Sequence, residues 1–162
     1  MAYVARDYDA DLKECSMSSS LDKSYELPDG AKVTIASERF RCAEALINPR
    51  LVGVDKPGIP QSIYNSVMKC DIHLRKDLLT NIIIAGGNTL MKGLEDRVTK
   101  DLKNLLPESS LVKVVAAPER KYSVWIGGSI LSSLSTFDSQ WIMKEDYEEN
   151  GPGISARCEY FV

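Results

Sequence analysis

The clearest pattern in the sequence is a helical repeat of apolar residues that Pro107 closes. Apolar side chains spaced three or four residues apart line one face of an α-helix, and proline cannot continue a helix. The pattern predicts a helix with Asp96 and Lys100 paired four residues apart on its wet side. The apolar stripe consists of Leu90, Leu94, Val98, Leu102, Leu105 and Leu106.

Two short apolar runs flank this helix. Residues 81–85 contain three consecutive isoleucines before Gly86-Gly87, and residues 112–117 are stopped by Pro118. β-Branched residues favour strands, and an unbroken apolar run is typical of a strand buried on both faces of a parallel, helix-covered sheet. A helical pattern returns over residues 122–134. The order strand, helix, strand, helix predicts the α/β fold class.

The first 36 residues are less regular. Residues 3–24 are polar, with a serine-rich end, and predict a helix followed by a loop. Residues 25–27 and 32–35 surround Pro28-Asp29-Gly30, in which proline presets φ and glycine tolerates a positive φ. We therefore expect a short β-hairpin.

Residues 37–80 alternate between helical patterns and chain breaks. Ser37 is a typical N-cap residue and predicts a short helix that runs to about residue 45. Prolines and glycines then break the chain over residues 47–59. The helical spacing returns over residues 61–70, and apolar positions continue to Thr80.

Composition and charge exclude several classes of protein. The chain has 162 residues, of which 44% are hydrophobic and 27% charged, as in soluble globular proteins. Its net charge is −3 and no basic stripe occurs, so we expect no nucleic acid partner. Its apolar runs are far shorter than the ~20 residues of a membrane span, and residues 1–7 lack signal-peptide order, which predicts a cytoplasmic protein without membrane contact. Cys15, Cys42, Cys70 and Cys158 lie far apart and suggest reduced thiols.

Two segments could carry ligand chemistry. Glycines at Gly86-Gly87, between a strand and a helix, let backbone N–H groups approach a phosphate or ribose. Residues 118–122 form a charged loop directly after a strand, where ligands bind in open α/β sheets. From spacing alone, an ordinary strand-to-helix turn is the favoured explanation of the first segment, and a solvated turn explains the second at least as well. His73, the single histidine, lies in a polar, surface-like stretch, so we assign no catalytic residue and no metal ligand. Residues 144–149 are interpreted as a solvated helical face.

Several motifs, taken together, resemble the actin family. The longest is Glu119-Arg120-Lys121-Tyr122-Ser123-Val124-Trp125-Ile126-Gly127-Gly128-Ser129-Ile130-Leu131, followed by Ser135-Thr136-Phe137, which is similar to the C-terminal region of actins nearly letter for letter. Residues 21–30, 38–42, 68–71 and 75–78 and the Gly86-Gly87 turn follow the family in the same order. The resemblance extends from about residue 3 to residue 160.

The resemblance implies an RNase H-like ATPase fold of two lobes, each built on a five-stranded sheet, with nucleotide between them. The glycine-containing hairpins that grip the phosphates in that family precede the start of this sequence, so we expect the C-terminal part of an incomplete actin-like lobe. The implied domains are residues 3–54, part of the small outer subdomain with the start of the plug loop; residues 55–122, the nucleotide-facing α/β subdomain; and residues 123–162, the C-terminal helical segment of the barbed-end subdomain.

The resemblance also implies three sets of site residues. Those facing ATP or ADP, bound with Mg²⁺ in full-length members, are Gly86, Gly87, Asn88, Leu90, Met91 and Lys121. One wall of a cleft for the next filament subunit and for profilin-like or cofilin-like proteins consists of Ile130, Leu131, Leu134 and Thr136. The plug loop, which contacts the opposite strand of the filament, includes Ile47, Leu51, Val52, Gly53 and Val54.

The sequence departs from the family pattern at three places. Residues 88–92 replace the usual Thr-Thr-Met-Tyr-Pro and remove an aromatic ring beside the base. His73 replaces an acidic residue, and the tail from Arg157 runs past the usual Lys-Cys-Phe ending. These departures are compatible with a divergent actin or a close actin-related protein.

Two functional hypotheses remain open. The first is a fragment of a cytoskeletal actin-family protein that in full-length form binds ATP and polymerises. The second is a truncated actin-like module that docks on a partner complex or filament end without ATPase activity. In either case we expect the chain alone not to hydrolyse ATP, and we expect a strand without its neighbour to promote association.

Overall fold

A computed structural model describes residues 1–154, and the chain divides into two units, Met1–Lys121 and a second that begins at Tyr122. Cys158 and the tail from Arg157 lie outside the described residues. In the first unit the helices are α1 (Tyr8–Met17), α2 (Glu38–Glu44), α3 (Ile59–Lys69), α4 (Ile72–Thr80) and α5 (Leu94–Leu105), with 3-10 turns η1 (Pro49–Val52) and η2 (Gly87–Leu90). Its strands are β1 (Lys23–Glu26), β2 (Lys32–Ile35), β3 (Ile82–Ile83) and β4 (Val114–Val115). The second unit contains α6 (Ser123–Ser132), η3 (Ser135–Gln140) and α7 (Lys144–Asn150).

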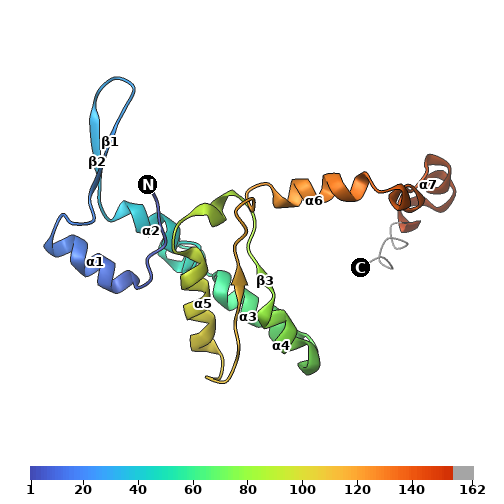
Figure 1. The fold of residues 1–162 in the computed structure, drawn as a ribbon, viewed down its shortest axis with the longest axis horizontal. Helices are drawn as coiled ribbons and strands as arrows, with labels where there is room; N and C mark the ends of the chain where they lie inside the picture. Colours follow the sequence, from blue (N-terminus) through green and yellow to red (C-terminus); the bar gives the residue numbers. More distant parts are fainter. Residues whose placement is uncertain (155–162) are drawn as a thin grey trace. The chain divides into compact units, whose positions relative to one another are not determined.

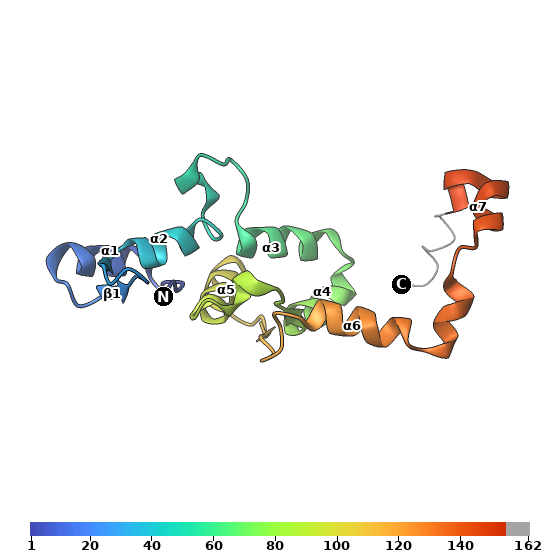
Figure 2. The ribbon, with the colours of Figure 1, turned by 90° about the horizontal axis from the view of Figure 1, so that it is seen from above.

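The centre of the first unit is a parallel pair of strands connected through a helix. Ile82 pairs with Val114 and Ile83 with Val115, and α5 lies between β3 and β4 in the chain. The order β3, α5, β4, α6 confirms the predicted alternation of strand and helix. Helices α3 and α5 lie side by side, as Figures 1 and 2 show.

Only one face of this strand pair is buried, so the prediction of burial on both faces is wrong. Ile82 and Ile84 are each 8% exposed, whereas Ile83 between them is 73% exposed. Successive side chains of a strand point to opposite faces of the sheet. The helices of the first unit therefore cover the face that carries Ile82 and Ile84.

Helix α5 contributes the middle of its predicted stripe to the core. Leu94, Val98 and Leu102 are at most 2% exposed, and they pack in one cluster with Val4, Ala43, Ile82, Ile84 and Val114. Leu90, at the start of the stripe, and Leu105, near its end, are about 40% exposed. The helix begins only at Leu94, so Leu90 belongs to η2 and not to the helical face.

Charged contacts bring the N-terminal segment onto α5. The backbone N–H of Val4 donates to the carbonyl oxygen of Lys92 at 2.8 Å, and Val4 and Ala5 are buried. The ammonium of Lys100 lies 3.6 Å from the Asp7 carboxylate, so the predicted pairing with Asp96 is wrong. Lys100 pairs with a carboxylate of the N-terminal segment, which is distant in sequence, and not with one of its own helix.

Tyr3 connects the N-terminal segment to α1 and α2 through one hydrogen bond and one ring contact. Its hydroxyl donates to Asp11 at 2.9 Å, and its ring lies against Phe40 with centroids 5.7 Å apart. Burial, together with the hydrogen bond to Asp11 and its negative charge, raises the pKa of Tyr3 to about 12. The phenol is thereby held in its neutral form as part of the packing.

A buried ion pair joins α2 to α5. One Nη of Arg97 lies 2.8 Å from the Glu44 carboxylate, and the side chains of Arg97 and Glu44 are only 11% and 4% exposed. The other Nη donates to Glu44 at 3.0 Å and to the Ala5 carbonyl at 2.8 Å, while Nε donates to Asp101 at 2.8 Å. Burial raises the pKa of the Glu44 carboxyl, and the Arg97 guanidinium opposes that rise. All three nitrogens of this guanidinium donate hydrogen bonds to acceptors within the protein.

The remaining elements follow the sequence with local differences. Strands β1 and β2 form the predicted antiparallel hairpin, with Lys23 opposite Ile35. Ser37 stands at the N-cap position of α2 but makes no side-chain capping hydrogen bond, so its predicted capping role is wrong. His73 is exposed, as expected, and Cys15, Cys42 and Cys70 are free thiols.

The second unit exposes most of its apolar side chains. Helix α6 has no buried residue, and Trp125 is 78% exposed. The rings of Phe137 and Trp141 pack edge to face, with their centroids 5.4 Å apart. Helix α7 confirms the predicted charged helical face, with Lys144 3.6 Å from Glu148. None of the helices within residues 1–154 is long and apolar enough to cross a membrane.

The ion pair predicts a large effect of removing the arginine. Arg97→Met leaves the buried Glu44 carboxylate without its partner, and we expect the free energy of unfolding to fall by about 3–5 kcal/mol. Lys100→Met, which removes a half-exposed cation from the same helix, serves as the control and should cost far less. Urea unfolding followed by circular dichroism measures both variants. Equal losses in the two would contradict a special role for Arg97.

Candidate functional site

The first candidate site begins where β3 ends. Gly86 has φ 97° and ψ 163°, a conformation that is essentially confined to glycine because any side chain would strain it. The 3-10 turn η2 follows at once, and Thr89 Oγ1 donates to the Gly86 carbonyl at 2.7 Å. Gly86 therefore allows the chain to turn sharply from a buried strand into a short helical turn.

The segment after β4 is hydrogen-bonded to this glycine turn. The Gly86 N–H donates to the Arg120 carbonyl at 2.8 Å. In return, Nε and one Nη of Arg120 donate to the Thr89 carbonyl, both at 3.2 Å. Because β3 and β4 are parallel, the two segments meet at the carboxyl ends of adjacent strands. Ligands of open α/β sheets bind at this position.

The structure brings together most of the residues predicted to face a nucleotide. Gly86, Gly87, Asn88 and Leu90 lie in or directly before η2, and Lys121 directly follows Arg120, which contacts that turn. Met91 differs, because its partly buried side chain packs against the hydrophobic core. Met91 therefore also supports the turn, and its contact with a nucleotide stays a prediction.

Sequence reasoning missed the role of Arg120. The loop of residues 118–122 was identified as charged, but its arginine turns back to Thr89 and to the Ala117 carbonyl, the latter at 3.0 Å. Arg120 therefore positions the loop against the glycine turn. In the sequence, Arg120 was marked only by its place after a predicted strand. That place does not show whether the arginine bonds to a neighbouring loop or faces solvent.

The chemistry available at this site is binding chemistry. The first N–H groups of a 3-10 turn have no acceptor within it, and here they belong to Gly87 and Asn88. Such donors, with the exposed Lys121 nearby in sequence, suit the oxygens of a sugar or phosphate. Within residues 1–154, no group of three or more His, Cys, Asp or Glu side chains could hold a metal ion.

The second candidate surface lies on α6 and η3. Ile130, Leu131 and Leu134 are 61%, 48% and 49% exposed, and Thr136 is exposed as well. Neither leucine is therefore buried within the described residues. Their role as a wall of a partner cleft stays a prediction.

The predicted plug loop has two parts, a residue that packs against the core and an exposed tip. Ile47 packs against the core, and a Cβ added at Gly58 would lie 1.7 Å from the Ile47 carbonyl oxygen, so this close approach requires glycine. At the tip, Leu51, Val52 and Val54 are 50%, 62% and 46% exposed.

Two features hold that exposed tip as a tight turn. Gly53 has φ 77°, a left-handed conformation, and Arg50 Nε lies 3.2 Å from the Asp55 carboxylate. The turn therefore presents its apolar side chains outward. A filament contact through them stays a prediction.

Comparison with known families agrees with the resemblance seen in the sequence. A model of the actin family, described as Actin, matches residues 1–159 of the chain.

The glycine turn predicts different effects at neighbouring positions. Gly86→Ala forces a side chain into a strained backbone conformation, and we expect a loss of about 1–3 kcal/mol in the free energy of unfolding. Gly87→Ala is the matched control, because open space surrounds its Cβ position and its φ lies outside the left-handed range. It should change stability by no more than about 0.5 kcal/mol. Chemical denaturation of the two variants tests this, and an equal loss at both positions would contradict the assigned backbone strain.

Proposed function

Because the chain belongs to the actin family, we propose that it is a cytoskeletal protein whose glycine turn and Lys121 form the adenosine-facing wall of an ATP site. The observation that carries the proposal is the hydrogen bond from Gly86 N–H to the Arg120 carbonyl. It fixes two segments, each weak evidence alone, at the carboxyl ends of adjacent parallel strands, a common place for a nucleotide.

The residues present fit the nucleoside better than the metal. The N–H groups of Gly87 and Asn88 would meet sugar or phosphate oxygens, and the Lys121 side chain would lie beside the base. Within the described chain no carboxylate cluster could hold Mg²⁺, so we assign no metal ligand. When bound, Mg²⁺ with ATP would be held chiefly by the nucleotide's own phosphates.

This proposal predicts weak nucleotide binding that depends little on the phosphates. We expect a Kd on the order of 10–1000 µM for ATP, because one wall contacts only part of the ligand. Adenosine should bind within about threefold of ATP. Lys121→Ala should weaken both, whereas Lys13→Ala on α1, an exposed lysine outside this site, should weaken neither.

Isothermal titration calorimetry with ATP, ADP and adenosine measures these affinities. A submicromolar Kd for ATP, or ATP bound more than tenfold tighter than adenosine, would show that phosphate contacts dominate and would contradict the assigned wall. Identical behaviour of the Lys121 and Lys13 variants would place the nucleotide elsewhere.

We also propose that the apolar strip of Ile130, Leu131 and Leu134 binds other actin-type subunits or actin-binding proteins of the profilin-like or cofilin-like kind. Helix α6 supports this proposal, because it has high apolar content and no buried residue within the described chain. Large apolar surfaces left exposed are typical of protein interaction sites. The plug-loop residues Leu51, Val52 and Val54 are proposed as a second filament contact.

The alternative is a module that docks on a partner complex or filament end without hydrolysing ATP. The same exposed strip favours it, since docking requires the apolar surface and not the nucleotide. Docking does not require a nucleotide, so an absence of adenosine binding in the calorimetric titration would favour this module.

The strip predicts a separation of binding from stability. Leu131→Asp and Leu134→Asp should abolish sedimentation with actin filaments or binding to a cofilin-like protein, while changing the free energy of unfolding by less than about 1 kcal/mol. Leu102→Ala removes a fully buried side chain and should cost about 2–5 kcal/mol. If the aspartate variants unfold as readily as Leu102→Ala, the two leucines are core residues and the strip is not a surface.

A further inference from the structure

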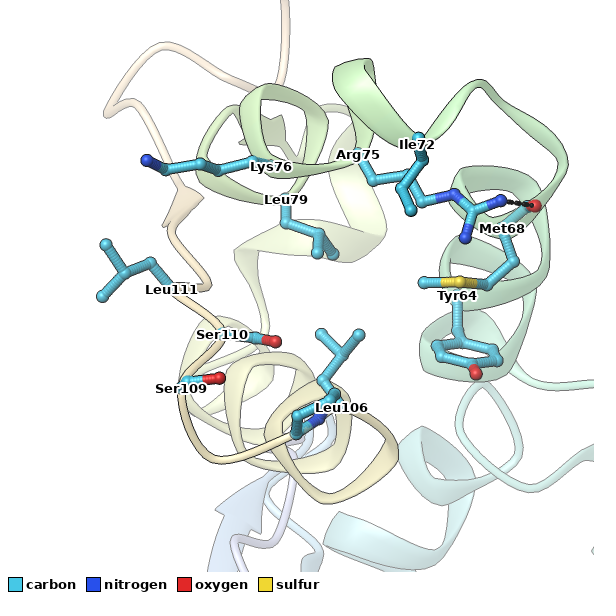
Figure 3. A pocket seen from close by; sticks show the side chains of 11 residues that line it. Tyr64, Met68, Ile72, Arg75, Lys76, Leu79, Leu106, Ser109, Ser110 and Leu111 are labelled. Atoms are coloured by element: carbon cyan, nitrogen blue, oxygen red, sulfur yellow. Dashed lines mark hydrogen bonds between the residues drawn. The ribbon is translucent and has the colours of Figure 1, made fainter.

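A cavity of the first unit lies away from the glycine turn. It has a volume of about 690 Å³ and opens between α3, α4 and the segment that follows α5 (Figure 3). Small-molecule sites in proteins commonly have volumes of about 300–1000 Å³. None of its lining residues belongs to the three predicted sites, so an inference about it stands apart from the proposed function.

Apolar side chains form the floor and the two sides of this cavity. Leu79 of α4 and Leu106 after α5 face it from opposite elements, and Tyr64 and Met68 of α3 line one side. Leu79 is 5% exposed and anchors α4 in the unit. At the mouth, Ile72 and Leu111 are 71% and 68% exposed.

Local contacts of the main chain fix both sides of the cavity. Arg75 Nε donates to the Cys70 carbonyl at 3.0 Å, and one Nη donates to the Met68 carbonyl at 2.9 Å. These contacts cap the end of α3 and hold α4 against it. On the other side, the Ser110 N–H donates to the Pro107 carbonyl at 2.9 Å and closes a turn.

The charges at the cavity all have one sign. Arg75 and Lys76 line it and no Asp or Glu does. Within the described residues, Lys76 makes no ion pair and no hydrogen bond through its ammonium group, and its side chain extends from the rim in Figure 3. The hydroxyls of Ser109 and Ser110 stand on the same side of the opening. A concave apolar surface with cations alone at its edge attracts anions.

We propose that this cavity binds a free long-chain carboxylate, with the alkyl chain on the apolar floor and the carboxylate at the mouth beside Lys76. An apolar ligand body suits the floor, where Leu79, Leu106 and Met68 contribute apolar side chains. A single negative charge satisfies the rim, where Ser109 and Ser110 add hydroxyl donors. An alkylammonium or an alcohol of the same chain length lacks the negative charge that would pair with Lys76.

The experiment uses the full chain and dansylated undecanoic acid as a fluorescent probe, displaced by decanoate, dodecanoate, dodecanol or dodecylammonium below their micelle concentrations. Dodecanoate should displace the probe at least fivefold more effectively than dodecanol, and dodecylammonium should be weakest. Each added methylene should raise the affinity by about twofold to fourfold.

Matched variants locate the site. Lys76→Glu and Leu111→Glu should each weaken probe binding by about fivefold to tenfold. Their controls are Lys13→Glu, which reverses an exposed lysine on α1, and Leu51→Glu, which changes an exposed leucine on η1, and neither control should weaken binding. In methyl-labelled protein, dodecanoate should shift the methyl resonance of Met68, which lines the cavity, and leave that of Met17, which is 81% exposed, unchanged.

Three outcomes would overturn the proposal. Equal displacement by dodecanol and dodecanoate would show that the carboxylate charge does not contribute to binding. Equal effects of the cavity variants and their controls would assign binding to general adsorption on exposed apolar surface. Self-association of the chain that Leu111→Glu abolishes, with no saturable probe binding, would assign the cavity to a second protein chain.

Discussion

The first unit depends on one buried guanidinium. Arg97 contacts the Ala5 carbonyl, the Glu44 carboxylate and the Asp101 carboxylate, and so fixes the N-terminal segment, α2 and α5 around a common core. Two charges out of water are tolerated only where each satisfies the other and the remaining donors find acceptors. The N-terminal segment held in this way also bonds to Lys92, directly after the glycine turn. Through this hydrogen bond, the Arg97 contacts are connected to the segment that follows η2.

That wall consists of main-chain geometry more than of side-chain chemistry. A glycine conformation, a hydrogen bond between two loop backbones and a returning arginine bring together segments separated by more than 30 residues. The covered face of β3 and β4 provides the rigid base, and the two loops at their ends provide the donors. Membership of the actin family gives this arrangement its most direct interpretation, while the cavity between α3 and α4 lies on different residues and needs no nucleotide for its explanation.

Much of this fold could be predicted from local patterns, and the errors have a common cause. The stripe of Leu94, Val98 and Leu102, the hairpin and the alternation of strands with helices all depend on periodicity within a short window. The exposure of Ile83 and the partner of Lys100 depend on segments far away in sequence. At the site, the glycine turn and the loop after β4 were each recognisable from the sequence. No sequence pattern indicated that Arg120 turns back to bond to Thr89. The Arg97 contacts, which span 53 and 92 positions, were equally invisible to pattern analysis.

The division into two units has a consequence for how the chain is made. All partners of the core helix α5, from Val4 to Val114, precede Lys121, and the exposed helix α6 follows it. Domains generally fold as units, from the N-terminal side, during synthesis. The residues that close this core therefore leave the ribosome before α6 does, so the first unit can begin to fold without α6.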